Sequence, residues 1–279
     1  MIPNCISTYV SVDFEFQPAS SIFISESEKI IYDVIRIQNS IPLFWEEHLN
    51  RFLQSLSLTN VPHSYTPQKL HKAIVEFIAQ ENIVEGNIRI SCNCSSCSKQ
   101  LYIYQISHSY PHRYMYENGV ESDLLYAERS NPKVKQELPV REIANREIQK
   151  QQLYDIVLVD SQNNIREGSR TNIFFIDSQL NLITAPEQDV LNGISRKKII
   201  EIAHLLHIPV VEKKIPVASL PEYKSAFFTG TSPRILPIKS IGTQTFSVNN
   251  NIIQLILKTY NSYIEQYIIN QKTQKTKDL

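Results

Sequence analysis

Polar residues of segment 159–196 have types and spacing that could perform chemistry. The alternation of the segment predicts a hairpin, a loop and the start of a helix. Glu167 stands beside Gly168, the amide Asn172 follows, and Asn192-Gly193 precedes the predicted helix. A purely structural hairpin needs neither the carboxylate nor the amide. We therefore interpret the segment as a ligand-binding site.

The composition is that of a globular protein whose partners are small molecules or a copy of itself. The 279 residues are 42% hydrophobic, which is enough to bury a sizeable core. Lysine plus arginine and aspartate plus glutamate both number 28, so the formal net charge is zero. A nucleic-acid footprint or a polybasic membrane anchor would require an excess of positive charge.

The sequence has neither the apolar run of about 18 to 20 residues that a membrane span needs nor a secretory start. We therefore predict a cytoplasmic protein. Four cysteines are too few for a disulfide scaffold. Cys92, Cys94 and Cys97 cluster at the tip of a predicted hairpin, where small residues are common. A metal-binding module that uses these three cysteines is the alternative, but a site with four ligands would need a further thiolate or imidazole from elsewhere in the chain. We therefore expect no metal site.

Glycine is scarce, because the chain has six where average usage of about 7% would give roughly 20. Gly168, Gly193 and Gly230 lie in the segments that carry the chemistry. This placement indicates tight turns or close backbone approach to a ligand.

The predicted elements alternate between strands and helices in both halves of the chain. In the first half, residues 20–45 contain a predicted strand pair, residues 45–58 and 67–83 follow helical spacing, and 86–110 form a hairpin. In the second half, helices at 140–151 and 194–207, strands near 210, 226–228 and 235–241, and a closing helix from 250 to 271 are expected. This order predicts an α+β fold with mixed or antiparallel sheets flanked by helices. The expected domains are a small N-terminal lobe at 1–118, a linker at 119–124 and a larger C-terminal lobe at 125–279.

A family resemblance rests on a spaced pattern of residues. The pattern comprises Glu167-Gly168-Ser169-x-x-Asn172-Ile173-Phe174, Leu182-x-Thr184 and Leu191-Asn192-Gly193-Ile194-x-Arg196. It resembles the signature of the class IV, or fold-type IV, pyridoxal-phosphate enzymes, which include branched-chain and D-amino-acid aminotransferases and aminodeoxychorismate lyases. His48-Leu49-x-Arg51-Phe52, with Tyr32 before it, and Phe228-Thr229-Gly230-Thr231-Ser232 are similar to further family motifs. The resemblance extends from about residue 20 to 268.

The resemblance implies pyridoxal 5'-phosphate, an aromatic, phosphorylated compound, as cofactor and assigns residues to it. A lysine must form a Schiff base with the cofactor, an acid must keep the pyridine nitrogen protonated, and donors must hold the phosphate. The family places the lysine a little over 30 residues before the glutamate, which both Lys133 and Lys135 satisfy. We favour Lys135, which would also transfer the substrate proton. The proposed cofactor contacts are Arg51, Lys135, Glu167, Asn172, Gly193, Ile194, Ser195 and Thr231, with phosphate donors at Arg51, Thr231 and the helix start at 193–195.

The substrate contacts are less constrained by the resemblance. Tyr32, Arg89, Thr231 and Ser232 are the candidates. Arg89 resembles an arginine that in some members faces a substrate carboxylate, although a strand arginine can equally face solvent, and Tyr32 can be pocket wall or core. Val140 replaces a tyrosine usual in branched-chain enzymes, and Arg170 replaces a small residue.

The predicted function is that of an aminotransferase, which moves an amino group between an amino acid and a 2-oxo acid. The favoured amino acid is a branched-chain-like one. The alternatives are an aminodeoxychorismate lyase that releases pyruvate, a D-amino-acid aminotransferase, and a non-catalytic protein with the family's shape. The resemblance also implies a homodimer with the site between two lobes.

Overall fold

The structure is a computed structural model that describes residues 2, 4–22, 29–95, 99–129, 131–137 and 139–277. The chain packs as two compact units. The first comprises Met1–Ser109, Val134–Glu137 and Tyr263–Leu279, and the second comprises Tyr110–Lys133 and Leu138–Ser262. The lobe boundaries predicted from the sequence stay a prediction, because a division by contacts describes packing and not independent folding.

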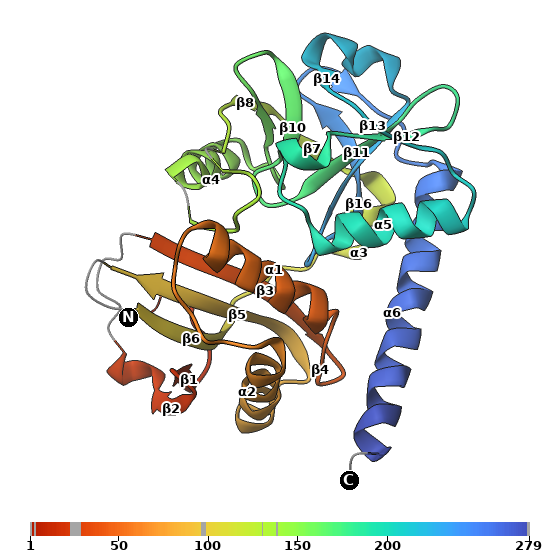
Figure 1. Ribbon diagram of the computed structural model, residues 1–279. Coiled ribbons are helices and arrows are strands. Elements are labelled where there is room, and N and C mark those ends of the chain that lie inside the picture. Colours follow the sequence, from red (N-terminus) through yellow and green to blue (C-terminus); the bar gives the residue numbers. More distant parts are fainter. Residues whose placement is uncertain are drawn as a thin grey trace. The chain divides into compact units, whose positions relative to one another are not determined.

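The first unit contains a twisted sheet with two helices packed against it (Figure 1). Its strands follow the order β2-β1-β6-β5-β3-β4. The elements are β1 (Tyr9–Val12), β2 (Glu15–Pro18), a 3-10 turn η1 (Ala19–Ser21), β3 (Lys29–Gln38), β4 (Ile41–Pro42), α1 (Trp45–Leu58), α2 (Pro67–Gln80), β5 (Glu85–Cys94) and β6 (Lys99–Ile106). The long strand, both helices and the hairpin are confirmed, whereas β1 and β2 were not predicted. The first strand of the predicted pair extends into 23–28, outside the described residues.

Helices α1 and α2 form because their apolar residues recur at helical spacing and face the sheet. Leu49, Phe52 and Leu56 of α1 are fully buried and belong to the core of the first unit. At the start of α2, the Thr66 hydroxyl accepts a hydrogen bond from the backbone N–H of Lys69 at 3.2 Å. The buried apolar residues of α1 pack this helix on β3, which positions the polar residues that project from both.

A short extended segment, Val134–Glu137, adds to the edge of β3 within the first unit. The N–H of Tyr32 donates to the carbonyl of Lys135 at 3.0 Å, and the N–H of Glu137 donates to the carbonyl of Ile30 at 3.0 Å. Val134 is fully buried in the core of this unit. The segment that contains Lys135 is therefore held against β3 by backbone hydrogen bonds, although the sequence predicted no strand there.

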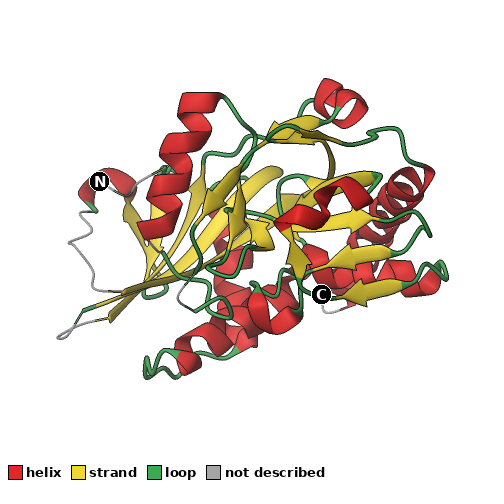
Figure 2. Ribbon diagram, turned by 90° about the horizontal axis from the view of Figure 1, so that it is seen from above, coloured by secondary structure: helices red, strands yellow, loops and turns green. Residues whose placement is uncertain are grey.

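The second unit contains two sheets. One has the order β14-β10-β9-β8, and the other has the order β13-β12-β11-β15-β16-β17, with β7 beside β16. The elements are α3 (Arg113–Asn118), β7 (Val120–Ser122), β8 (Leu124–Tyr126), α4 (Pro139–Gln151), β9 (Val157–Val159), β10 (Asn164–Gly168), β11 (Asn172–Ile176), β12 (Leu182–Thr184), η2 (Glu187–Asp189), α5 (Ile194–Leu205), β13 (Val210–Glu212), β14 (Ile215–Pro216), η3 (Val217–Glu222), β15 (Ser225–Gly230), β16 (Arg234–Ile241), β17 (Gln244–Thr245) and α6 (Asn251–Lys277), whose last part belongs to the first unit. The sheets are accompanied by helices (Figure 2), which confirms the predicted α+β class.

The chain passes from one sheet to the other between β10 and β11. The hairpin predicted in segment 159–196 is β11–β12, and β10 pairs instead with β9 and β14. The buried Asp155 carboxylate fixes the connecting turn, because it accepts hydrogen bonds from Ser169 Oγ at 2.6 Å, Thr171 Oγ1 at 2.7 Å and the Arg170 N–H at 3.2 Å. Glu167 and Asn172 thus stand at the two ends of one rigid turn.

Among the described residues, the structure contains no helix that is both long and apolar enough to cross a membrane.

Candidate active site

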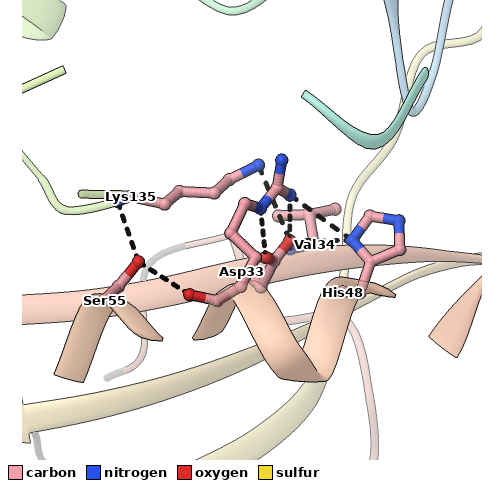
Figure 3. A network of polar contacts seen from close by, with 6 residues as sticks. Asp33, Val34, His48, Ser55 and Lys135 are labelled. Atoms are coloured by element: carbon pink, nitrogen blue, oxygen red, sulfur yellow. Dashed lines mark hydrogen bonds and ion pairs between the residues drawn. The ribbon is translucent and has the colours of Figure 1, made fainter. Parts of the chain in front are cut away.

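Asp33, on β3 in the first unit, is the centre of a buried polar network (Figure 3). Its carboxylate accepts two hydrogen bonds from Arg51 on α1, from Nε at 2.8 Å and from Nη2 at 2.7 Å. His48 Nδ1 lies 3.0 Å from the same carboxylate, and the N–H of Val34 donates to it at 2.7 Å. This two-point grip sets the orientation of the Arg51 guanidinium.

The electrostatics of this network keep Asp33 ionised. Burial alone would raise the pKa of the Asp33 carboxyl, yet the neighbouring Arg51, Lys135 and His48 hold that pKa well below its usual range. Burial lowers the pKa of His48, and the adjacent Asp33 opposes this shift. Arg51 is therefore a buried cation with a permanent counter-ion.

Lys135 belongs to the same network. Its Nζ lies 3.6 Å from Asp33 Oδ1, and its side chain is 14% exposed. Its backbone N–H donates to Ser55 Oγ at 3.3 Å, and that hydroxyl donates to the Arg51 carbonyl at 2.9 Å. Figure 3 shows the lysine side chain extending over α1 toward Asp33. The two residues that the sequence assigned to Schiff-base formation and phosphate binding thus share one carboxylate.

Lys133, the alternative lysine, has a different environment. It is exposed and belongs to the second unit, whereas Lys135 is half-buried in the first. An exposed lysine keeps its full hydration. The surroundings therefore favour Lys135 as the reactive amine.

Tyr32 and Arg89, two of the substrate candidates, lie together beside Lys135. The Arg89 guanidinium carbon stands 4.1 Å from the centroid of the Tyr32 ring, and Lys135 Nζ stands 5.7 Å from it. Tyr32 is buried. Arg89 also forms an ion pair of 2.6 Å with Glu137. Arg89 is thus largely shielded from solvent, and Glu137 would compete with a substrate carboxylate for its guanidinium.

Glu167, in the second unit, is a buried carboxylate at the end of β10. Its Oε2 accepts from Asn172 Nδ2 at 3.2 Å and from the N–H of Leu191 at 3.1 Å. Its Oε1 lies 3.5 Å from Arg129 Nη1. Burial raises the pKa of Glu167, while Arg129 and the Leu191 N–H act in the opposite direction.

A cavity of about 210 Å³ opens beside Glu167 within the second unit. Arg129, Arg166, Leu158 and Asp189 contribute to its walls together with Glu167. Arg166 is already paired with Asp160 at 2.7 Å and with Asp189 at 2.5 Å. Arg129 is therefore the cation of this cavity that lies directly against Glu167.

The start of α5 approaches Asn172 closely. Asn172 Nδ2 donates to the Leu191 carbonyl at 2.9 Å, and a Cβ placed on Gly193 would collide with Asn172 Oδ1. In the part of the chain that the structure describes, no side chain caps this helix start. The first N–H groups of a helix carry partial positive charge and bind anions. The Gly193 N–H donates to the Leu191 carbonyl at 2.8 Å, so the N–H groups of Ile194 and Ser195, at the start of the helix, are the backbone donors suited to a phosphate.

Thr231 and Ser232 lie in the turn between β15 and β16 and are half-buried. The pairing of β11 with β15 puts Asn172 opposite Thr229, so this turn lies at the same end of the sheet as Asn172. Thr184, by contrast, donates its hydroxyl to the Ile173 carbonyl at 2.8 Å. Its observed contact joins the two strands of the β11–β12 hairpin.

Sequence reasoning missed Asp33, Arg129 and Asp155. Asp33 did have a signal, because a lone carboxylate inside the apolar run KIIYDVIRI is costly to bury without cationic partners. Nothing local to Arg129 or Asp155 distinguishes them from ordinary surface residues. Their roles depend on partners that lie 38 and 14 to 16 residues away along the chain.

The cysteine cluster can be followed only in part, because Cys97 lies outside the described residues. Cys92 and Cys94 approach with their sulfurs 3.6 Å apart at the end of β5. Burial raises the pKa of the Cys92 thiol to about 12. Among the residues the structure describes, no group of three or more His, Cys, Asp or Glu side chains is arranged to hold a metal ion.

Comparison with known proteins decides the family. The model of amino-transferase class IV matches residues 30–241. The chain belongs to the class IV aminotransferase family. A probable branched-chain-amino-acid aminotransferase of Thermotoga maritima is 25% identical over 243 residues, which cover 85% of this chain and 84% of that protein.

Solved structures of this family share the fold. The branched-chain amino acid aminotransferase from Thermobaculum terrenum, in its PLP-form, matches with a TM-score of 0.78 at 18% identity, covering 92% of this chain and 94% of that one. A putative 4-amino-4-deoxychorismate lyase of Legionella pneumophila matches with a TM-score of 0.78 at 20% identity, covering 87% and 97%. The fold is therefore fold-type IV, and it accommodates proteins named for two different reactions.

Proposed function

We propose that this class IV family member is a pyridoxal-phosphate-dependent aminotransferase that transfers an amino group between a branched-chain-like amino acid and a 2-oxo acid. One observation carries the proposal. Lys135 Nζ lies 3.6 Å from the buried carboxylate that orients Arg51. An amine for covalent attachment and a fixed cation for a phosphate thus occur together, as a phosphorylated aldehyde requires.

The residues of the second unit fit the rest of that cofactor. Glu167 is buried and contributes to the wall of a cavity. The start of α5 offers backbone donors, and Gly193 admits the close approach of Asn172 because it lacks a Cβ. When bound, pyridoxal phosphate supplies an electron sink for the carbanion formed at the substrate α-carbon.

The protein's own residues would perform the remaining tasks. Lys135 Nζ would hold the cofactor and then move the proton at the substrate α-carbon. Glu167 would retain a proton on the ring nitrogen, and Asn172 would keep the Glu167 carboxylate in place. Arg51, the hydroxyl of Thr231 and the N–H groups at 194–195 would bind the phosphate.

Borohydride reduction of the cofactor-loaded protein, followed by peptide mapping, tests the covalent role. We expect the label on Lys135 and none in the Lys135→Ala variant. Lys133→Ala is the matched control and should retain the label. A label on Lys133 would transfer the role to that residue, and an unlabelled wild-type protein would remove the basis of the proposal.

A lyase is the second candidate, because a structure named as a putative aminodeoxychorismate lyase matches this chain over 87% of its length. A panel of amino acids and aminodeoxychorismate separates the two reactions. Transamination leaves the cofactor in its amine form, which is visible in its absorbance, and produces a 2-oxo acid from each competent amino acid. Pyruvate release from aminodeoxychorismate, without any such change for amino acids, would favour the lyase.

Homodimer formation also stays a proposal, which rests on the family resemblance and on a net charge of zero. The molar mass of the protein in solution, measured by light scattering, tests it. A monomer at the concentration at which the protein is active would contradict it.

A further inference from the structure

Glu137 forms an ion pair with Arg89, the arginine that the sequence assigned to substrate recognition. Its Oε1 lies 2.6 Å from Arg89 Nη2. The Arg89 side chain is only 17% exposed, whereas that of Glu137 is 47% exposed. Both residues belong to the first unit, so the contact is internal to it.

The backbone fixes where the Glu137 carboxylate can reach. Segment Val134–Glu137 pairs with β3, and the N–H of Glu137 donates to the Ile30 carbonyl at 3.0 Å. Residues two apart on an extended strand project from the same face. Glu137 therefore projects from the same face as Lys135, the proposed reactive amine.

The ring of Tyr32 connects the two cations. Arg89 lies over this ring at 4.1 Å and Lys135 at 5.7 Å. A ligand that binds beside Lys135 and extends along this ring would therefore approach Arg89. An arginine beside an apolar ring surface is suited to a carboxylate, because its planar fork can bind two oxygens.

Arg89 in this chain already has a carboxylate. Glu137 occupies one of its terminal nitrogens, and Arg89 Nε is buried without a hydrogen-bond partner among the described residues. A substrate carboxylate arriving here must displace Glu137 or remain close to its negative charge. Either event weakens the binding of a substrate with a second carboxylate, whereas a substrate with a neutral side chain avoids this cost.

We propose that Glu137 is a specificity-determining residue that occupies Arg89 as an internal carboxylate and so disfavours amino acids and 2-oxo acids with a second carboxylate. The inference rests on the proposed function, because it assumes that the substrate binds beside Lys135. It narrows the substrate class to monocarboxylic acids with a neutral side chain.

Glutarate is the direct probe, since this dicarboxylate has neither an amino nor an oxo group and binds without turnover. We would measure its affinity for the cofactor-loaded protein by calorimetry. Glu137→Gln and Glu137→Ala should both bind glutarate about tenfold more tightly than wild type, because they release one charged hydrogen-bond donor. Adding Arg89→Gln to Glu137→Gln should abolish this gain.

Glu142→Gln is the matched control, because it removes one negative charge from an exposed residue of α4. It should leave glutarate affinity unchanged. The competing explanation is that the Arg89–Glu137 ion pair lies at the surface and has no effect on substrate binding. Unchanged glutarate affinity in both Glu137 variants, or a gain that persists without Arg89, would establish it and overturn the proposal.

Kinetics provide a second readout that separates the two hypotheses. The ratio of kcat/KM for 2-oxoglutarate to that for 2-oxo-4-methylpentanoate should rise about tenfold in Glu137→Gln. Transamination with an unchanged ratio would overturn the role of Glu137 while leaving the proposed function intact. A gain in glutarate affinity without transamination would support the carboxylate site and contradict the proposed function.

Discussion

Single side chains in this protein gain their chemical character from the partners that tertiary packing supplies. Arg51 and Lys135 share Asp33, and Glu167 faces Arg129. Both carboxylates, Asp33 and Glu167, are buried. Because water does not stabilise a buried charge, the ionised form of each carboxylate depends on its cationic and hydrogen-bonding neighbours. The strongest predictions at this scale therefore concern the partners that sequence reasoning missed.

Replacing Asp33 by Asn should destabilise the protein by about 3 to 5 kcal/mol at neutral pH, because Arg51 loses its buried counter-ion. The Asp33 pKa is lowered in the folded state, so its contribution is complete above the unfolded-state value and is lost as the pH falls toward the folded-state value. Urea denaturation at several pH values measures this. A difference in unfolding free energy that stays constant down to the acid limit would contradict the assignment.

Replacing Arg129 by Gln should raise the pKa of Glu167 further, because burial then acts with less opposition. If ionised Glu167 is needed for turnover, the acid limb of the pH–rate profile moves to higher pH. Arg166→Gln is the matched control, since Arg166 lines the same cavity but pairs with Asp160 and Asp189. Equal shifts in both variants would show that only the general charge of the cavity matters.

At the scale of elements, short connections position the proposed cofactor contacts apart from Arg51, which lies on α1. The turn at 169–171 is fixed by Asp155, and the start of α5 is held against Asn172. Segment Val134–Glu137 is fixed by backbone pairing with β3. A Cβ at Gly193 would collide with Asn172 Oδ1, which makes this glycine a sensitive test of the start of α5.

Gly193→Ala should weaken binding of pyridoxal phosphate by about tenfold or more, because the new Cβ collides with Asn172 Oδ1 and displaces the start of α5. Leu205→Ala, at the exposed far end of the same helix, is the control and should leave affinity unchanged. Fluorescence titration of the apoprotein measures both. Equal affinity of Gly193→Ala and wild type would show that this helix start does not hold the phosphate.

At the scale of the whole molecule, the proposed cofactor contacts are divided between the two packing units. Arg51 and Lys135 belong to the first, whereas Glu167, Gly193 and Thr231 belong to the second. A ligand that binds only the folded protein stabilises it by about 2.7 kcal/mol at a free concentration one hundred times its Kd. Thermal unfolding with and without pyridoxal phosphate should reveal this gain.

Hydrogen exchange can locate the stabilisation. We expect slower exchange on cofactor binding both in segment 134–137 with α1 and at the start of α5, because residues of both units are assigned to the ligand. Lys135→Ala should keep part of the protection at α5, since the phosphate contacts there are unchanged. Protection confined to one unit in the wild-type protein would refute the assignments made in the other.

The sequence by itself indicated the family, which the match to the family model then showed, and it predicted the α+β class and every residue proposed to contact the cofactor. Motif spacing and residue periodicity are local properties, and they suffice for α1, α2, α5 and the β11–β12 hairpin. They also placed Glu167 with Asn172, which lie only five residues apart along the chain.

Only the tertiary structure decided which partner each charge has. Lys135 joins Asp33 and Arg51 because segment Val134–Glu137, in which the sequence predicted no strand, adds to the edge of β3. Arg129 meets Glu167, and Glu137 meets Arg89, across 38 and 48 residues of chain. Pairing free energy depends on distance and burial in three dimensions, and local sequence patterns contain neither quantity.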